Sequence, residues 1–156
     1  MTPQTDATEV TRLLETLARG WNTASGATYA SAFAGDADFI NILGMHARGR
    51  DLIARGHDEI LATVFRGTRM TAVVDSVRFL RPDVATVEAT LSLRQADGQP
   101  FTFSGPSRPP MPHTKAGYVA TKQGETWSIA VFRNMVPFAR PAAGPVERAL
   151  EAESVR

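Results

Sequence analysis

The chain has 156 residues, 43% hydrophobic and 21% charged, and its 17 basic residues nearly balance 16 acidic ones to give a net charge of +1. These values are typical of one globular domain with a real core, and they give no electrostatic footprint for nucleic acid or an anionic membrane. There is no cysteine, which excludes disulfides, thiolate nucleophiles and thiolate metal ligands.

The N-terminal sequence MTPQTDATEV has neither a charged start nor an apolar run, so we expect no signal peptide. No apolar segment approaches the roughly 20 residues that span a bilayer. A cytoplasmic protein is therefore expected.

Two helices are predicted before any strand. Apolar residues at three-and-four spacing predict the first from Asp6 to Trp21. The second is predicted from Ala27 to Ala34, with Gly35 as its stop. Trp21 is either a core anchor or a pocket wall. Two leading helices argue against a sheet of alternating strands and helices.

The central stretch, residues 36–65, predicts a strand (Asp38–Leu43), a turn at Gly44, a second strand (Met45–Arg48) and a helix (Arg50–Phe65). Two polar groups in it stand where apolar residues are expected. Alternation puts Asn41 on the same strand face as Phe39 and Leu43. On the helix, His57 shares a face with Ile53, Gly56, Ile60 and Val64, and is either a satisfied core histidine or a functional group.

From Met70 the hydrophobic period changes to two, which predicts an antiparallel sheet. The four expected strands are Met70–Leu80, Val84–Arg94, Lys115–Lys122 and Trp127–Val136. In the second of these strands one face is apolar and the other polar. The polar row suits an outer face, a wet pocket or a subunit interface. In the last strand, Phe132 and Asn134 are expected to face the pocket, together with Ser128 and Ala130.

A proline-rich loop is expected from Gln95 to Thr114, because Pro106, Pro109, Pro110 and Pro112 oppose regular pairing. It is either an exposed linker or a lid over the mouth of a cavity. Residues 1–137 are predicted to form one domain. Residues 138–156 are predicted to form a Pro/Gly-rich tail with a short helix or a frayed end.

The available chemistry is narrow. No nucleophile elbow, HExxH, GxGxxG or phosphate-binding loop is present, and the three histidines are widely spaced, so neither a metal nor a cofactor is expected. Acid–base chemistry, or binding alone, in an apolar pocket is what remains. The polar candidates are Asn41, His57, Glu88, His113 and Asn134.

Two local patterns together carry a family resemblance. One is a strand, Gly44, and then Arg48-Gly49-Arg50 opening a helix that contains His57; the other is the last strand, Trp127 to Asn134. They resemble the nuclear transport factor 2-like (NTF2-like) superfamily, which includes ketosteroid isomerase, scytalone dehydratase and SnoaL-type polyketide cyclases. They are most similar to its SgcJ/EcaC branch from natural-product clusters, including enediyne polyketide clusters. The resemblance spans about Asp6 to Val136.

The resemblance implies an α+β cone-shaped barrel, in which a curved antiparallel sheet wraps around three helices from the N-terminal half and encloses a pocket. It implies a homodimer and a cofactor-free cyclase, isomerase or dehydratase acting on an apolar, polyketide-like intermediate. A non-catalytic ligand-binding or chaperone-like module and an empty scaffold dimer are the alternatives. The expected catalytic residues are His57, Asn134 and Asn41. The expected binding residues are Trp21, Tyr29, Phe33, Phe39, Ile60, Phe132 and His113.

Overall fold

The computed structural model of the chain describes residues 3–105, 108–111 and 113–137. The predicted tail, residues 138–156, lies outside the described residues. The helices are α1 (Pro3–Asn22), α2 (Gly26–Ala30) and α3 (Arg50–Ala62). The strands are β1 (Phe33–Ile40), β2 (His46–Arg48), β3 (Arg69–Arg81), β4 (Val84–Arg94), β5 (Phe103–Gly105), β6 (Arg108–Met111), β7 (His113–Gln123) and β8 (Thr126–Met135).

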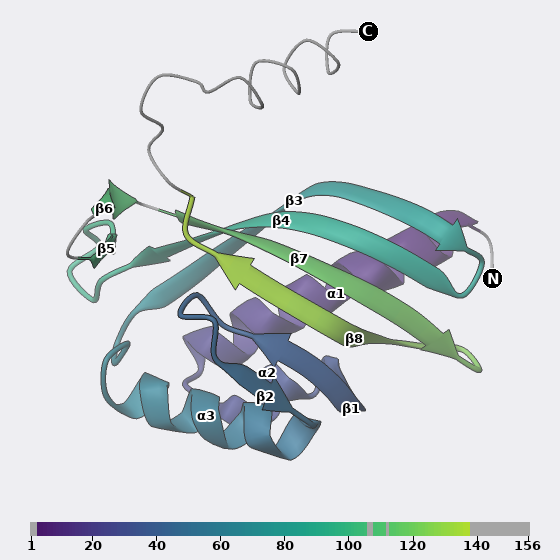
Figure 1. The fold of residues 1–156 in the computed structure, drawn as a ribbon, viewed down its shortest axis with the longest axis horizontal. Helices are drawn as coiled ribbons and strands as arrows, with labels where there is room; N and C mark the ends of the chain where they lie inside the picture. Colours follow the sequence, from purple (N-terminus) through teal and green to yellow (C-terminus); the bar gives the residue numbers. More distant parts are fainter. Residues whose placement is uncertain (1–2, 106–107, 112, 138–156) are drawn as a thin grey trace, which may run out of the picture.

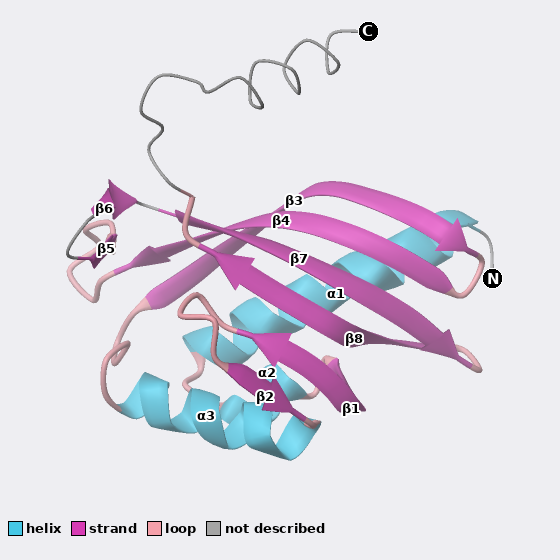
Figure 2. Ribbon diagram, viewed as in Figure 1, coloured by secondary structure: helices cyan, strands magenta, loops and turns pink. Residues whose placement is uncertain are grey.

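Six strands form one curved sheet in the order β2-β1-β8-β7-β4-β3, and the helices lie on one side of it (Figures 1 and 2). Helix α1 runs along the inner face of the sheet, where it contacts β3 and β8, while α3 packs against β1 and β2. This arrangement confirms the predicted α+β fold with a cone-like curved sheet. The sheet is mixed, however, because β1 pairs with β8 in parallel.

Helix α1 forms as its apolar spacing predicts. Its buried residues are Val10, Leu13, Leu14, Leu17 and Trp21. The inner face of the sheet holds α1 at two points. The Tyr118 hydroxyl donates to the Val10 carbonyl oxygen at 2.9 Å. The Asp6 carboxylate accepts from both Lys122 Nζ and Trp127 Nε1 at 2.9 Å, and these hydrogen bonds lower the Asp6 pKa.

The second helix is shorter than predicted. It ends at Ala30, and the chain then enters β1 at Phe33, so Gly35 lies in a strand and does not stop the helix. The reason is pairing with a distant segment. The Ile129 amide donates to the Ala32 carbonyl oxygen at 2.8 Å, and the Arg50 guanidinium donates to the Phe33 carbonyl oxygen. Tertiary pairing therefore overrides the local helical signal.

The first strand also ends earlier than predicted, at Ile40. The Asn41 side-chain oxygen accepts hydrogen bonds from the backbone amides of Leu43 and Met45, both at 2.9 Å, which folds the chain into a turn. Leu43 is therefore 77% exposed and does not continue the inner face.

Helix α3 ends at Ala62, three residues before the predicted end. Ile53, His57 and Leu61 are its buried residues, whereas Val64 lies beyond the helix and is exposed. The prediction that Val64 and Gly56 share the buried face was wrong. The inward position of His57 is confirmed by its 6% exposure.

Strand β8 contains an irregularity that the alternation did not predict. Val131 pairs with Val119 and Ile129 with Ala120, so Ala130 is an extra residue, a β-bulge. The bulge reverses the alternation. Trp127 and Ile129 are therefore buried on the same face as Phe132, and the prediction that Ser128 and Ala130 share that face was wrong.

The proline-rich segment pairs after all, since β5 and β6 form a two-stranded ribbon. Its register joins Phe103 to Met111 and Gly105 to Arg108. Pro109 and Pro110 lie between these paired positions, where the register shifts.

Candidate functional site

An aromatic cluster fills the inner end of the cone and surrounds His57. The Tyr29 ring stacks on the imidazole with a centroid distance of 3.8 Å and an interplanar angle of 20°. The edges of Trp21 and Phe39 meet it at 6.3 Å and 5.3 Å. Phe39 in turn stacks on Phe132 of β8 at 5.1 Å. Five of the seven predicted binding residues thus lie in one cluster with His57: Trp21, Tyr29, Phe33, Phe39 and Phe132.

All members of the cluster are buried, with small differences in exposure. Phe33 and Phe132 are 0% exposed, whereas Trp21, Phe39 and His57 are 6–8% exposed. His57 is therefore among the members of the cluster that are not completely enclosed.

His57 is held in one tautomer by its own helix. Its Nδ1 lies 2.8 Å from the Ile53 carbonyl oxygen, which can only accept, so Nδ1 carries the proton. No described residue makes a hydrogen bond with Nε2. Burial lowers the pKa of His57 to about 4. At neutral pH the imidazole is therefore uncharged, with a free lone pair on Nε2.

Asn134 provides a second polar group on the same inner face. Its amide oxygen Oδ1 is buried and accepts no hydrogen bond from the described part of the chain. Asn134 follows Phe132 by two strand positions, which is about 6.6 Å. Phe132 stacks on Phe39, and the Phe39 ring in turn contacts the His57 ring, so the aromatic rings connect the strand that carries Asn134 with His57. An unsatisfied buried acceptor costs about 1–3 kcal/mol, so Asn134 Oδ1 is poised for a donor from a ligand.

The other predicted site residues are placed differently. Asn41 follows Ile40, which pairs with Arg133, so the parallel register leads Asn41 toward Asn134. Its oxygen is already used by the turn described above. Ile60 is half-buried against the core. His113 pairs with Ser92 on the outer face of the sheet, away from the aromatic cluster.

Strand β7 supplies inner-face residues that were not among the predicted site residues. Thr114, Ala116 and Tyr118 are all buried, and Ala116 pairs with Asn134. The Tyr118 ring stacks on Phe132 with centroids 6.3 Å apart. The alternation along His113–Gln123 contains the signal for this row, but the sequence does not tell which of the two faces is the inner one.

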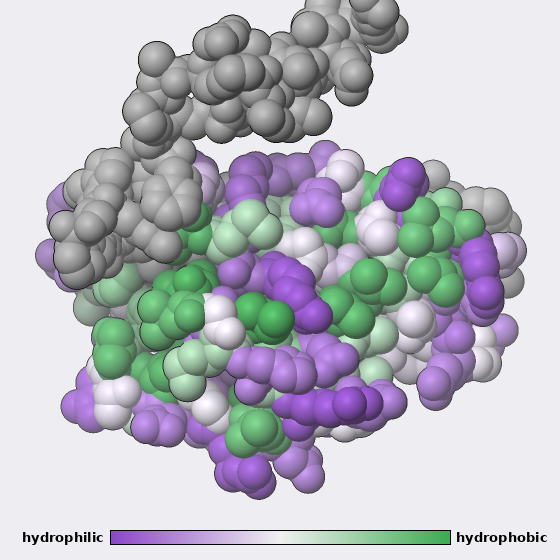
Figure 3. All heavy atoms as spheres, viewed as in Figure 1, coloured by the Kyte–Doolittle hydropathy of each residue, from purple (hydrophilic) through white to green (hydrophobic). Residues whose placement is uncertain are grey.

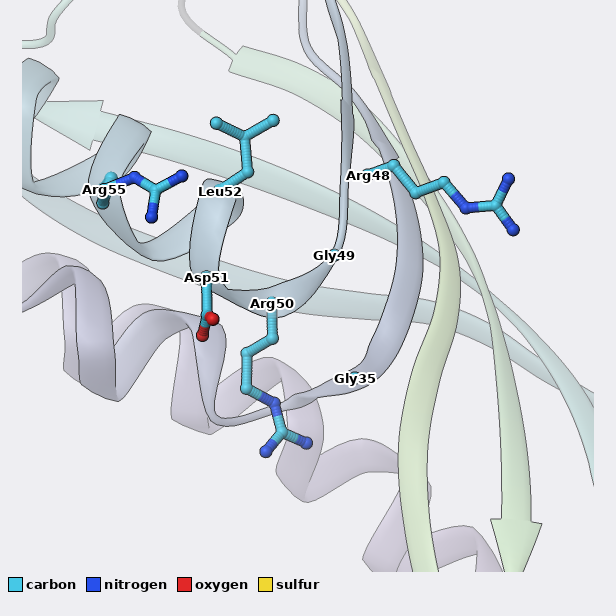
Figure 4. A pocket seen from close by; sticks show the side chains of 7 residues that line it. All are labelled: Gly35, Arg48, Gly49, Arg50, Asp51, Leu52 and Arg55. Carbon is cyan, nitrogen blue, oxygen red and sulfur yellow. The ribbon is translucent and has the colours of Figure 1, made fainter.

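Two hollows lie outside the aromatic cluster. One of about 560 Å³ lies at the start of α3, lined by Gly35, Arg48, Gly49, Arg50, Asp51, Leu52 and Arg55. Figure 4 shows that the guanidinium groups of Arg48, Arg50 and Arg55 lie apart and do not meet at one point, and Arg50 is bonded to the Phe33 carbonyl oxygen. The other, of about 630 Å³, lies between the starts of β1 and β8. Neither hollow is lined by His57, Asn134 or a ring of the aromatic cluster.

Two kinds of site are not found in the part of the chain that the structure covers. No group of three or more His, Asp or Glu side chains there could hold a metal ion. None of its helices combines the length and the apolar character needed to cross a membrane.

Solved structures share this fold along nearly the whole chain. No protein-family model and no curated protein matches the sequence. A domain of unknown function with a cystatin-like fold from Nostoc punctiforme is 28% identical, with 99% of this chain and 89% of that chain covered and a TM-score of 0.73. An uncharacterised protein with a cystatin-like fold from Caulobacter vibrioides is 24% identical, with 93% and 97% covered and a TM-score of 0.72.

A third structure, from Novosphingobium aromaticivorans, is provisionally named a scytalone dehydratase. It is 16% identical, with 90% of this chain and 95% of that chain covered and a TM-score of 0.62. An NTF2-like protein of unknown function from Shewanella oneidensis aligns with a TM-score of 0.66. These similarities establish a cystatin-like, NTF2-like fold. Folds of this kind host different functions, so the chemistry must be argued from the site.

Proposed function

We propose that the protein binds a largely apolar small molecule between His57 and Asn134 and acts on it by cofactor-free acid–base chemistry, as a cyclase, isomerase or dehydratase. One observation supports this most directly. Two polar groups with unused hydrogen-bonding capacity lie within an otherwise aromatic interior. A polar group there is costly unless it acquires a partner, and a ligand can provide one.

At neutral pH His57 is present as the neutral imidazole, which is the form that accepts a proton. With a pKa of about 4, only roughly one imidazole in a thousand is protonated at pH 7. The Nδ1 proton is engaged with Ile53, so Nε2 is the atom left to take a proton from a ligand. Asn134 would orient the reacting group, and Tyr29 holds the imidazole ring in place by stacking.

The natural-product setting rests on the sequence resemblance to the SgcJ/EcaC branch. An apolar, polyketide-like substrate fits a cluster of aromatic rings. The provisional scytalone dehydratase name of one structural neighbour is in keeping with a dehydratase or isomerase.

A non-catalytic binding module is the second candidate, and one observation favours it. Among the described residues, the polar or charged residues that are buried as a whole are Asp6, His57, Thr68 and Thr114, and Asn134 adds only a buried amide oxygen. Asp6 is bonded to Lys122 and Trp127, and Thr68 accepts from Trp21. Few groups remain for proton transfer.

Native mass spectrometry after incubation with an extract of the producing organism tests both candidates. We expect the wild-type protein to retain a small molecule or to release one changed by the mass of water or by isomerisation. His57→Phe should lose that activity. His46→Phe, which makes the same change at an exposed histidine on β2, should keep it. Retention without chemical change would favour the binding module, and neither retention nor change would contradict the proposed function.

We also propose that the protein is a homodimer formed through the outer face of the sheet. Figure 3 shows apolar residues gathered among polar ones on this side of the molecule. Val119 and Val131 form a paired apolar contact on that face, on the side opposite the buried Tyr118 and Phe132.

Sedimentation velocity at micromolar concentration should show a dimer that Val131→Glu converts to monomer. Val64→Glu, which adds the same charge at an exposed residue beyond α3, should leave the dimer intact. A monomeric wild-type protein would overturn the dimer proposal without touching the His57 site.

A further inference from the structure

We infer that the ligand of the His57 site is a hydrogen-bond donor, an uncharged aromatic molecule carrying a hydroxyl group that donates to His57 Nε2. The inference rests on the proposed function and adds the chemical class of the ligand. Two properties of the site carry it. Its unpaired polar atoms are hydrogen-bond acceptors, and no buried cation among the described residues could neutralise an anionic ligand.

The direction of the hydrogen bond follows from geometry. Because Nδ1 donates to the Ile53 carbonyl oxygen, Nε2 carries no proton and offers only a lone pair. A ligand carbonyl, ether or carboxylate oxygen facing Nε2 would place two acceptors against each other. A ligand hydroxyl or N–H would instead satisfy Nε2. Asn134 Oδ1, which is buried and also an acceptor, has the same preference for a donor.

Charge complementarity argues against an anionic ligand. No lysine or arginine is among the buried side chains in the described part of the chain. Lys122, which is only 13% exposed, is bonded to Asp6 at the N-terminal end of α1. A carboxylate or phosphate bound beside His57 would therefore be buried without a counter-charge, which is strongly unfavourable.

The walls of the site specify the shape of the ligand. Tyr29 stacks on one face of the imidazole, while Trp21 and Phe39 present their edges to it. Aromatic rings at these separations favour stacked or edge-to-face partners. A planar aromatic ligand with a hydroxyl on its rim satisfies both the walls and Nε2.

Three probes of similar shape test this inference: 2-naphthol, 2-methoxynaphthalene and 2-naphthoate. Binding to the full-length protein is measured by calorimetry and by tryptophan fluorescence, since Trp21 touches His57. We expect 2-naphthol to bind about tenfold more tightly than the methyl ether, because only the hydroxyl donates. The carboxylate should bind more weakly than the ether.

In His57→Phe the difference between naphthol and its ether should fall to about twofold or less, while the ether still binds. His46→Phe should retain the wild-type difference. A second measurement needs no variant: the ¹⁵N resonance of His57 Nε2 should shift on adding naphthol and not on adding the ether.

Each other outcome has a distinct meaning. Equal binding of naphthol and ether to the wild type would overturn the donor inference and leave an apolar binding site standing. If His57→Phe still bound naphthol about tenfold more tightly than the ether, the hydroxyl would not donate to His57, and the inference would be overturned. Failure of all three probes to bind would contradict the proposed function together with this inference.

Discussion

Alanine at position 20 is expected to lower the free energy of unfolding by about 3 kcal/mol, although alanine is the better helix former. Gly20 lies in α1 where α2 crosses it. A Cβ atom built on Gly20 would lie 2.2 Å from the backbone nitrogen of Tyr29 and 2.5 Å from its Cα. Backbone atoms cannot move aside as a flexible side chain can, so the two helices would have to separate.

Gly56 provides the matched control. It lies in α3, is exposed, and a Cβ atom there would meet nothing within 4 Å. Gly56→Ala should therefore stabilise the protein by about 0.5–1 kcal/mol through helix propensity alone. Urea unfolding followed by circular dichroism measures both changes. A Gly20→Ala variant as stable as the wild type would show that α1 and α2 do not pack this closely.

The Gly20→Ala substitution should also weaken ligand binding at the candidate site. Tyr29 stacks on the His57 ring, so displacing α2 moves one wall of the cluster. Weaker probe binding in Gly20→Ala than in Gly56→Ala, measured at a temperature where both are folded, is the expected sign of this coupling.

His57 should make the protein lose about 3 kcal/mol of stability as the pH falls from 6.5 to 4. Burial holds the folded-state pKa near 4, whereas an unfolded chain has an ordinary histidine pKa of about 6.5. Between these values the unfolded state binds a proton that the folded state does not, so stability declines with falling pH. Above pH 6.5 both states are neutral and this contribution is constant.

His57→Phe should remove that slope, because phenylalanine does not titrate. Urea unfolding of both proteins at pH 7, 6, 5 and 4 gives the comparison. Asp6, Asp38, Asp75 and Asp83 also have lowered pKa values, but their stabilisation is lost mainly below about pH 4 and is the same in both proteins, so it cancels in the comparison. Parallel stability curves for wild type and variant between pH 4 and 6.5 would mean that His57 is accessible to water and not buried.

The same burial links stability to chemistry. An imidazole kept neutral inside an aromatic cluster is costly to protonate, and that cost is what keeps Nε2 available as an acceptor at neutral pH. His57 is therefore both the proposed base and the residue that makes the stability of the fold sensitive to acid.

Local periodicity in the sequence predicted much of the fold. The apolar spacing of α1 and the alternation of β4 required no knowledge of distant residues, because each repeats within a few positions of the chain. Strand β4 has the predicted bounds, Val84–Arg94, with its apolar row buried and its polar row outward. The placement of His57 within the apolar arc of its helix followed from the same reasoning.

Other features depend on contacts between distant segments. The parallel pairing of β1 with β8 ended α2 early and drew Gly35 into a strand, and it joins residues about ninety positions apart in the sequence. The bulge at Ala130 decided which side chains of β8 face inward, since one extra residue reverses every later position. Neither the parallel pairing nor the bulge can be recognised from the residues that are near it in the sequence.

The sequence by itself determined α1, the long strands of the second half and the inward position of His57, because side-chain period and helix geometry are local properties of the chain. Only the tertiary structure decided which of its polar groups have hydrogen-bond partners. It used the Asn41 oxygen in a turn and put His113 on the outer face, and no described residue makes a hydrogen bond with Asn134 Oδ1 or His57 Nε2. Whether a polar atom is satisfied depends on what other segments bring to it, and that is settled only when the sheet closes around the helices.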